Sequence, residues 1–157
     1  MLRHAAQTWI DAGLEPVIVV ISGDRRLRAA LDGLQVTLVE NAQPERGISS
    51  SIALGIQALN DKQLSALIGV ADQPYLTVEA IRELLAASRP GRMVVPRYNG
   101  YRGNPVIFDR RFFPELLGLD GDRGGQRVVA AHPDAVIEVQ LAPQMGRDLD
   151  RPEDLPR

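Results

Sequence analysis

Apolar residues along the first half of the chain recur with two different spacings. Between residues 2 and 10 they return every three or four positions, which predicts an amphipathic helix, and Gly13 provides a left-handed stop after it. Short apolar runs rich in β-branched residues lie at residues 17–21, 36–39 and 67–71. Such runs predict strands that are buried on both faces. Helical spacing returns at residues 25–31, 48–59 and 77–87. Thr77 is the expected N-cap of the last of these helices.

The second half of the chain is less regular. Further strands are expected at residues 93–96, 105–108 and 135–141. Helices are expected around residues 112–117 and 126–131, with a glycine-rich loop at residues 118–125 between them. Strands that alternate with helices in this way predict right-handed crossovers and a mostly parallel sheet with helices on both faces. Because 157 residues contain neither a repeat nor a linker, we expect one α/β domain over residues 1–157.

Composition narrows the classes of function open to this domain. The net charge is −2 and the basic residues are scattered, so we expect no nucleic-acid partner. The chain has no cysteine, which excludes disulfides and thiolate metal sites and fits a reducing compartment. The longest apolar run, residues 17–21, is too short to cross a bilayer, and the first residues have the pattern of a helix, not of a signal peptide. We therefore expect a cytoplasmic protein without a membrane partner.

The best candidate for chemistry is an acidic residue next to a predicted strand. In an open parallel sheet, ligands bind beyond the carboxyl ends of the strands. Asp72 directly follows the run at residues 67–71, and the next two residues, Gln-Pro, turn the chain outward. A carboxylate at this edge suits Mg²⁺, which takes one or two protein ligands and leaves its other positions to water and phosphate. The alternative is a plain Asp-x-Pro turn in which the side chain bonds nearby backbone N–H groups.

A second acidic cluster, residues 148–154, follows the last predicted strand. Asp150 and Glu153 have the spacing of a capping box, and Pro152 suits the first turn of a helix, so a helix start is one interpretation. In the other interpretation, Asp150 and Asp72 converge on one divalent ion that clamps a triphosphate. The two interpretations are compatible.

Two polar segments flank these carboxylates in the predicted fold. Residues 41–51 lead from a strand into a helix, whose free N–H groups and three serine hydroxyls would suit an anionic or polar ligand. The alternative is that Ser49 or Ser50 caps the helix. Tyr98 and Tyr101 flank a loop glycine, where they would either stack on a substrate ring or cover the edge of the core.

Five segments, taken in their order along the chain, resemble motifs of the MobA-like nucleotidyltransferases. The resemblance is closest to the molybdenum cofactor cytidylyltransferase branch. They correspond to that branch's Gly-x-Ser-x-Ser, Gly-Asp-Gln-Pro, Pro-x-x-x-Gly-x-x-Gly-His/Asn-Pro, Leu-x-Gly-Asp-x-Gly and Asp-Ile-Asp-Thr-Pro-Glu-Asp patterns. The matching segments are residues 46–51 (Arg-Gly-Ile-Ser-Ser-Ser), 71–74 (Ala-Asp-Gln-Pro), 96–108 (containing Gly-Tyr-Arg-Gly-Asn-Pro), 119–124 (Leu-Asp-Gly-Asp-Arg-Gly) and 148–154 (Asp-Leu-Asp-Arg-Pro-Glu-Asp).

The resemblance implies a three-layer, nucleotide-diphospho-sugar transferase-like (Rossmann-like) fold and a reaction. The phosphate of a molybdopterin-type cofactor would attack the α-phosphorus of CTP, with Mg²⁺ on the triphosphate and pyrophosphate as the leaving group. Asp72 and Asp150 would be the catalytic, Mg²⁺-binding residues. The implied cofactor- and substrate-binding residues are Gly47, Ser49, Ser50, Ser51, Gln73, Arg102, Gly103, Asn104, Pro105 and Asp122. Ser49 to Ser51 would border the base and ribose, whereas residues 102–105 and Asp122 would face the second substrate.

The sequence departs from the family pattern at its start. The family opens with a strand followed by Leu-Ala-Ala-Gly-x-Ser-x-Arg-Met-Gly and a lysine, and none of these precedes Leu2. That strand is central in the family's sheet, so we expect an N-terminally truncated domain whose strands have unpaired edges, with self-association as one way to complete it. Two other functions stay open: an inactive nucleotide- or partner-binding remnant, and a sugar-nucleotide glycosyltransferase, although the paired aspartates usual in the latter are lacking. The choice between CTP and GTP also stays open.

Overall fold

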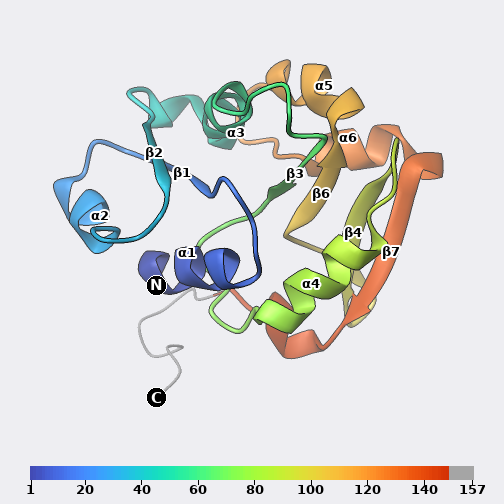
Figure 1. The fold of residues 1–157 in the computed structure, drawn as a ribbon. Coiled ribbons are helices and arrows are strands. Elements are labelled where there is room, and N and C mark those ends of the chain that lie inside the picture. Colours follow the sequence, from blue (N-terminus) through green and yellow to red (C-terminus); the bar gives the residue numbers. More distant parts are fainter. Residues whose placement is uncertain (149–157) are drawn as a thin grey trace.

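The computed structural model describes residues 1–148, in which strands and helices alternate along the chain (Figure 1). The strands are β1 (Ile18–Ile21), β2 (Thr37–Glu40), β3 (Ser65–Ile68), β4 (Met93–Tyr98), β5 (Tyr101–Arg102), β6 (Val106–Asp109) and β7 (Val136–Leu141). The α-helices are α1 (Leu2–Asp11), α2 (Arg25–Ala30), α3 (Ile48–Gln57), α4 (Val78–Ala87), α5 (Phe113–Leu117) and α6 (Gln126–Ala131). Every helix and strand expected within residues 1–148 is present, and the short strand β5 is an addition. The helix start considered at Asp150 lies outside the described residues.

The larger of two sheets places the carboxyl ends of three strands at one edge. Its strands pair in the order β3-β6-β4-β5, and β7 pairs with β4. Strand β6 is antiparallel to both β3 and β4, and β7 is parallel to β4. Strands β3, β4 and β7 therefore run in one direction, and the loops that follow them leave the sheet at the same edge. This is the edge at which an α/β sheet binds its ligands.

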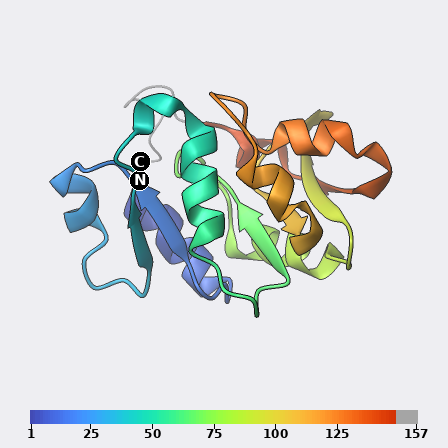
Figure 2. The same ribbon diagram turned by 90° about the horizontal axis from the view of Figure 1, so that it is seen from above.

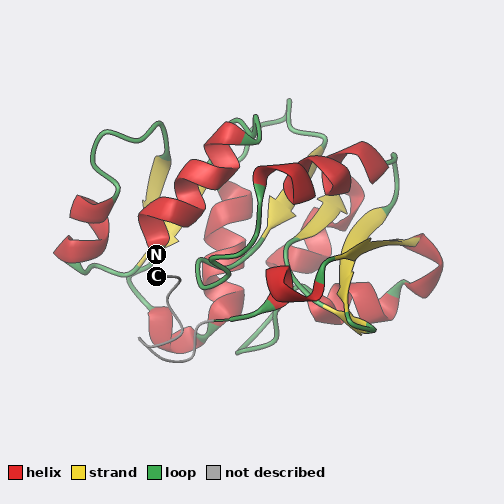
Figure 3. Cartoon of the chain, turned by 90° about the horizontal axis from the view of Figure 1, so that it is seen from below, coloured by secondary structure: helices red, strands yellow, loops and turns green. Residues whose placement is uncertain are grey.

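Helices cover both faces of this sheet and form the expected three layers (Figures 1 and 3). Alternate residues of β4 point to opposite faces: Val94 packs in a cluster with α4, whereas Met93 and Val95 pack in a cluster with α3, α5 and α6. All three side chains are fully buried. The sheet is thus anchored between two apolar layers, and its edge loops rest on a fixed frame. No helix within residues 1–148 is long and apolar enough to cross a membrane.

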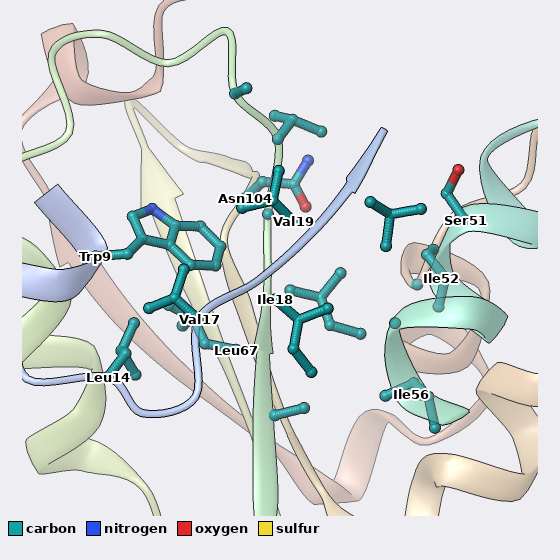
Figure 4. Close-up of a pocket in the computed structure, with 18 of the residues that line it drawn as sticks. Trp9, Leu14, Val17, Ile18, Val19, Ser51, Ile52, Ile56, Leu67 and Asn104 are labelled. Atoms are coloured by element: carbon teal, nitrogen blue, oxygen red, sulfur yellow. The ribbon is translucent and has the colours of Figure 1, made fainter. Parts of the chain in front are cut away.

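Strands β1 and β2 form a separate, parallel two-stranded sheet. In the described part of the chain, β1 pairs only with β2 and β3 pairs only with β6, so β1 and β3 each have one unpaired edge. Seen from above, the α3 ribbon lies between those of β1 and β3 (Figure 2). An apolar slot of about 460 Å³ is lined by residues of all three elements (Figure 4). Its lining includes residues 17–20 of the β1 segment, residues 65–71 around β3, Trp9 of α1 and Ile52 and Ile56 of α3. The unpaired strand edges implied by the family resemblance are therefore present.

The slot corrects the prediction that residues 17–21 form a strand buried on both faces. Ile18, Val19 and Val20 are only half-buried, because one edge of β1 borders the slot instead of another strand. The predicted bounds of the next central strand are also wrong, since β3 ends at Ile68 and Asp72 lies four residues beyond it. At Gly69 the Trp9 ring and Pro105 approach so closely that a β-carbon would lie 2.8 Å and 2.9 Å from them. Thr77 caps α4 as expected and accepts a hydrogen bond from the Ala80 amide at 3.2 Å.

The open slot beside β1 predicts that two isoleucine-to-alanine substitutions, one in each sheet, lower the stability of the domain by different amounts. Ile107 of β6 is 1% exposed, so Ile107→Ala should leave a cavity and lower the free energy of unfolding by about 2–5 kcal/mol. Ile18 of β1 already borders open space, so Ile18→Ala should cost less than about 1.5 kcal/mol. Urea unfolding of the 157-residue chain measures both values. Equal losses would contradict an open slot beside β1.

Candidate active site

The candidate site lies where the slot reaches the ligand-binding edge of the larger sheet. The segment after β3, the segment before β6 and the start of α3 all contribute residues to the lining of the slot. Asn104 and Ser51 lie toward one end of the slot, whereas Leu14 and Ile56 lie toward the other (Figure 4). Two residues expected at a ligand site are thus brought to the same end of one cavity, although they are far apart in the sequence.

Asp72 has an unsatisfied carboxylate oxygen at this edge. Its Oδ1 atom is buried and makes no hydrogen bond in the described part of the chain. A buried acceptor without a partner normally costs about 1–3 kcal/mol, and more when it is charged, so such an atom calls for a donor or a cation. The Oδ1 atom therefore does not serve as the acceptor of an Asp-x-Pro turn, and it fits a divalent cation, which prefers carboxylate oxygens.

Gln73 has the same feature. The residue is 7% exposed, and its side-chain oxygen Oε1 is buried without a hydrogen-bond partner. Two neighbouring residues of the Asp-Gln-Pro segment thus each hold an oxygen that can accept from a ligand or bind a cation. The other predicted metal ligand, Asp150, lies outside the described residues, so its convergence with Asp72 stays a prediction. Within residues 1–148 no group of three or more His, Asp or Glu side chains could hold a metal. A Mg²⁺ ion at Asp72 would therefore take its other ligands from water, phosphate and the predicted ligand Asp150.

The glycine-rich loop at residues 118–125 packs on the start of α3. Gly47 has a φ of +89° and is the N-cap of α3, and a β-carbon on it would collide with the Gly121 backbone and with Oδ1 of Asp122. The Ser49 amide donates to the Gly121 carbonyl at 3.2 Å. The structure thus brings together three of the predicted binding residues, Gly47, Ser49 and Asp122. It also shows that one N–H group of the helix start is already used within the chain.

Asn41, which was not among the predicted site residues, orients the serines of α3. It follows β2 directly and is 3% exposed. Its side-chain amide donates to Ser50 Oγ at 2.8 Å and to Ser51 Oγ at 3.0 Å, and its Oδ1 accepts from the Gln43 amide. The signal for it was available in the sequence, because it is a polar residue at the carboxyl end of a strand.

The serines of α3 therefore do not cap the helix, so the capping alternative considered for this segment is wrong. The N-cap is Gly47, without a side-chain cap bond, and Ser49 is buried. The Ser50 hydroxyl accepts from Asn41 and donates to the Gly47 carbonyl at 2.8 Å, so both of its roles are used within the chain. Ser51 is different, because its side chain lines the slot (Figure 4). Of the three serines, Ser51 is the one placed to contact a ligand in the slot.

Residues 102–105 divide into an exposed part and a buried part. Arg102 is exposed and donates to Glu138 Oε1 at 3.1 Å and 2.8 Å, while Arg97 donates to Glu138 Oε2 at 2.7 Å. The hydrogen bonds from Arg102, and to a smaller degree the one from Arg97, lower the pKa of the Glu138 carboxyl. Arg102 is thus bound to Glu138 instead of being free. Asn104 projects into the slot (Figure 4) and Pro105 is buried.

The two tyrosines of the hairpin have different positions. Tyr98 is 8% exposed and its hydroxyl donates to the Asn104 carbonyl at 2.6 Å, so it covers the edge of the core and does not present its ring to solvent. Tyr101 is 77% exposed. Of the two alternatives expected for this pair, stacking on a substrate or covering the edge of the core, Tyr98 therefore shows the second.

The Asn41 contacts predict a stability effect. Asn41→Ala removes the donor that holds Ser50 and Ser51 and should lower the free energy of unfolding by about 1–3 kcal/mol, because the hydroxyls lose a buried partner. Asn60→Ala is a matched control. Asn60 also accepts a backbone N–H two residues on, from Lys62, but is exposed, so its loss should cost less than about 1 kcal/mol. Similar losses in guanidinium unfolding would show that Asn41 is only a turn residue.

Known proteins share this sequence pattern. The profile of the family described as MobA-like NTP transferase domain matches residues 1–136. The chain is 26% identical over 167 residues to nicotine blue oxidoreductase from Paenarthrobacter nicotinovorans, covering all of this chain and 81% of that protein. It is 28% identical over 149 residues to a probable molybdenum cofactor guanylyltransferase from Natronomonas pharaonis, covering 84% of this chain and 69% of that protein.

The fold is also found in a solved structure. Rv0371c from Mycobacterium tuberculosis H37Rv, in complex with manganese, matches with a TM-score of 0.80 and 25% identity over 98% of this chain and 82% of that one. The expected nucleotide-diphospho-sugar transferase-like fold is thus confirmed. The family profile spans the slot, the Asp72 segment, the 102–105 loop and the glycine-rich loop, and ends before the acidic segment at residues 148–154. The chain belongs to the MobA-like NTP transferase family, a family of nucleotidyltransferases.

Proposed function

We propose that the chain holds the site of a Mg²⁺-dependent cytidylyltransferase that transfers CMP from CTP to the phosphate of a molybdopterin-type cofactor. The observation that carries this proposal is the buried, unpaired Oδ1 of Asp72 at the ligand-binding edge of the sheet. Three facts support it: the Asp-Gln-Pro segment of the cytidylyltransferase pattern, a relative named as a molybdenum cofactor guanylyltransferase, and a manganese complex of a protein with the same fold.

The residues divide into a nucleotide side and an acceptor side. Asp72, with Asp150, would hold Mg²⁺, which when bound neutralises charge on the triphosphate. Ser51 and the start of α3 would border the base and ribose, with Gln73 beside the ion. Asn104 and its neighbours, together with Asp122, would orient the acceptor phosphate. An oxygen of that phosphate forms a bond to the α-phosphorus of CTP while the bond to the β-phosphate oxygen breaks, and pyrophosphate leaves.

Other functions make different predictions. One relative is named an oxidoreductase, which favours a redox reaction on the same fold as a second candidate. A nucleotide-binding remnant would bind CTP without releasing pyrophosphate, and a glycosyltransferase would hydrolyse a sugar nucleotide. Preference for GTP would move the proposal to guanylyl transfer. Self-association through the open slot is a further prediction, which the mass of the chain in solution tests.

Asp72→Asn tests the metal assignment. The amide keeps the shape of the carboxylate but loses its charge, so pyrophosphate release from Mg²⁺ and CTP with a molybdopterin-type acceptor should fall about 100-fold or more while the unfolding midpoint stays near that of the wild type. The control is Asp61→Asn, since Asp61 is an exposed carboxylate paired with Arg110. It should leave turnover unchanged.

Each result has a definite meaning. Wild-type turnover in Asp72→Asn would overturn the role of Asp72. Binding of Mg²⁺ and CTP by the unaltered chain, measured by calorimetry, without any pyrophosphate release would favour the remnant. A substrate-dependent change in the absorbance of a redox dye, without nucleotide turnover, would favour the oxidoreductase.

A further inference from the structure

Tyr98 occupies the point where the loop before β6 meets the segment after β7. It is the last residue of β4 and is almost fully buried. Its hydroxyl donates to the Asn104 carbonyl at 2.6 Å. Asn104 is the residue of this loop whose side chain enters the slot (Figure 4). The phenol therefore fixes the backbone from which a candidate acceptor-binding side chain projects.

The Tyr98 ring also contacts two glycines from different segments. A β-carbon at Gly103 would lie 2.8 Å from the Tyr98 ring, and one at Gly146 would collide with the same ring. Gly103 belongs to the loop before β6, whereas Gly146 ends the 3₁₀ turn Pro143–Gly146 that follows β7. The position of the Tyr98 ring therefore constrains both the loop before β6 and the segment after β7. The segment after β7 continues in the sequence to the acidic residues 148–154.

Two further bonds hold the same loop without passing through Tyr98. The Gly103 amide donates to the Pro96 carbonyl at 3.0 Å, and Gln126 Nε2 donates to the Gly103 carbonyl at 3.2 Å. Gly103 is therefore fastened to β4 and to α6. The Asn104 carbonyl bonds to Tyr98 instead, so loss of the phenol hydroxyl would release Asn104 while leaving the rest of the loop attached.

The phenol is a donor over the whole working range of pH. Burial, and to a smaller degree the negative charge of Asp148, raise the pKa of Tyr98 to about 12. The hydroxyl therefore keeps its proton at neutral pH, where it can donate to Asn104.

We propose that Tyr98 is a positioning residue that sets Asn104 for the acceptor substrate and couples this loop to the segment after β7. The proposal rests on the proposed function, because it assigns Asn104 to the acceptor side of that site. Tyr98 itself touches neither substrate.

The test removes the hydroxyl and keeps the ring. Tyr98→Phe preserves the packing against Gly103 and Gly146 but loses the bond to Asn104, so the KM for the acceptor should rise about tenfold, as expected for one lost hydrogen bond, while the KM for CTP stays unchanged. Tyr101→Phe is the matched control, since Tyr101 is the cross-strand partner of Tyr98 in the hairpin but is exposed. It should change neither constant.

A second variant tests the coupling from the other segment. Gly146→Ala pushes against the Tyr98 ring from the segment after β7, so it should also raise the KM for the acceptor, and its effect should be smaller in the Tyr98→Phe background. Additive effects in the double variant would overturn the coupling. If Tyr98→Phe instead raises both KM values together and lowers the unfolding midpoint by several degrees, Tyr98 is only a packing residue and the proposal fails.

A readout without turnover separates this proposal from the proposed function. Trypsin cleaves after Arg102, two residues before Asn104, and its rate at that bond reports how firmly the loop is held. Faster cleavage in Tyr98→Phe than in Tyr101→Phe, with equal midpoints, supports positioning even if no pyrophosphate is released. Equal cleavage rates in the two variants would overturn it.

Discussion

The pairing of β4 with a strand on each side is the interaction on which the site depends. Strand β6 is antiparallel to β4 over Met93 and Val94, whereas β7 is parallel to β4 over its whole length. Because β3 pairs with β6 in turn, the ends of β3, β4 and β7 are brought to one edge although their loops are distant in sequence. Met93, Val94 and Val95 of β4 are fully buried between two helical layers, so this alignment cannot shift without opening the core. Asp72, Asn104 and Gly146 keep their relative places for that reason.

The slot between β1 and β3 gives the other half of the molecule a different character. An unpaired strand edge leaves backbone N–H and C=O groups without a strand partner, and half-buried valines and isoleucines leave apolar area beside them. Helices α1 and α3 both border the slot, so the two sheets are linked by packing and not by strand pairing. Ligand contacts made by Ser51, on the α3 side, and by Asn104, on the β6 side, would therefore join two parts of the fold that share no backbone ladder. Binding at this end of the slot would stabilise their relative position.

Much of this arrangement could be predicted from local sequence, and the failures have physical causes. Period and turn residues predicted each helix and all strands except β5, and Thr77 was identified as a cap because its bond reaches only to Ala80. The predicted end of β3 was wrong because the strand ends where its pairing with β6 ends, at Ile68 opposite Val106, and this partner is distant in sequence. The capping alternative for α3 is wrong because Gly47 is the N-cap, and because Asn41, from another element, binds the hydroxyls of Ser50 and Ser51. The ion pairs of Arg102 with Glu138 join residues 36 positions apart and have no local signal. At the site, the edge position of Asp72 was predictable, and the buried state of its free oxygen was not.

The contacts of Asn41 and Tyr98 show how such a frame can serve different reactions. Each is a buried polar residue at the end of a strand, and neither lines the slot. The Asn41 side chain binds two serines of α3, and the Tyr98 side chain binds the loop residue Asn104. Ser51 and Asn104, which line the slot, are carried by the segments held in this way. Relatives whose names place them in redox and nucleotidyl-transfer chemistry share the sequence pattern, so the scaffold alone does not select the reaction. The choice of reaction would then depend on the residues that Asn41 and Tyr98 hold in place. Exchanging Ser51 or Asn104 should alter substrate preference with less loss of stability than exchanging Asn41, because of these three only Asn41 satisfies several buried polar groups at once.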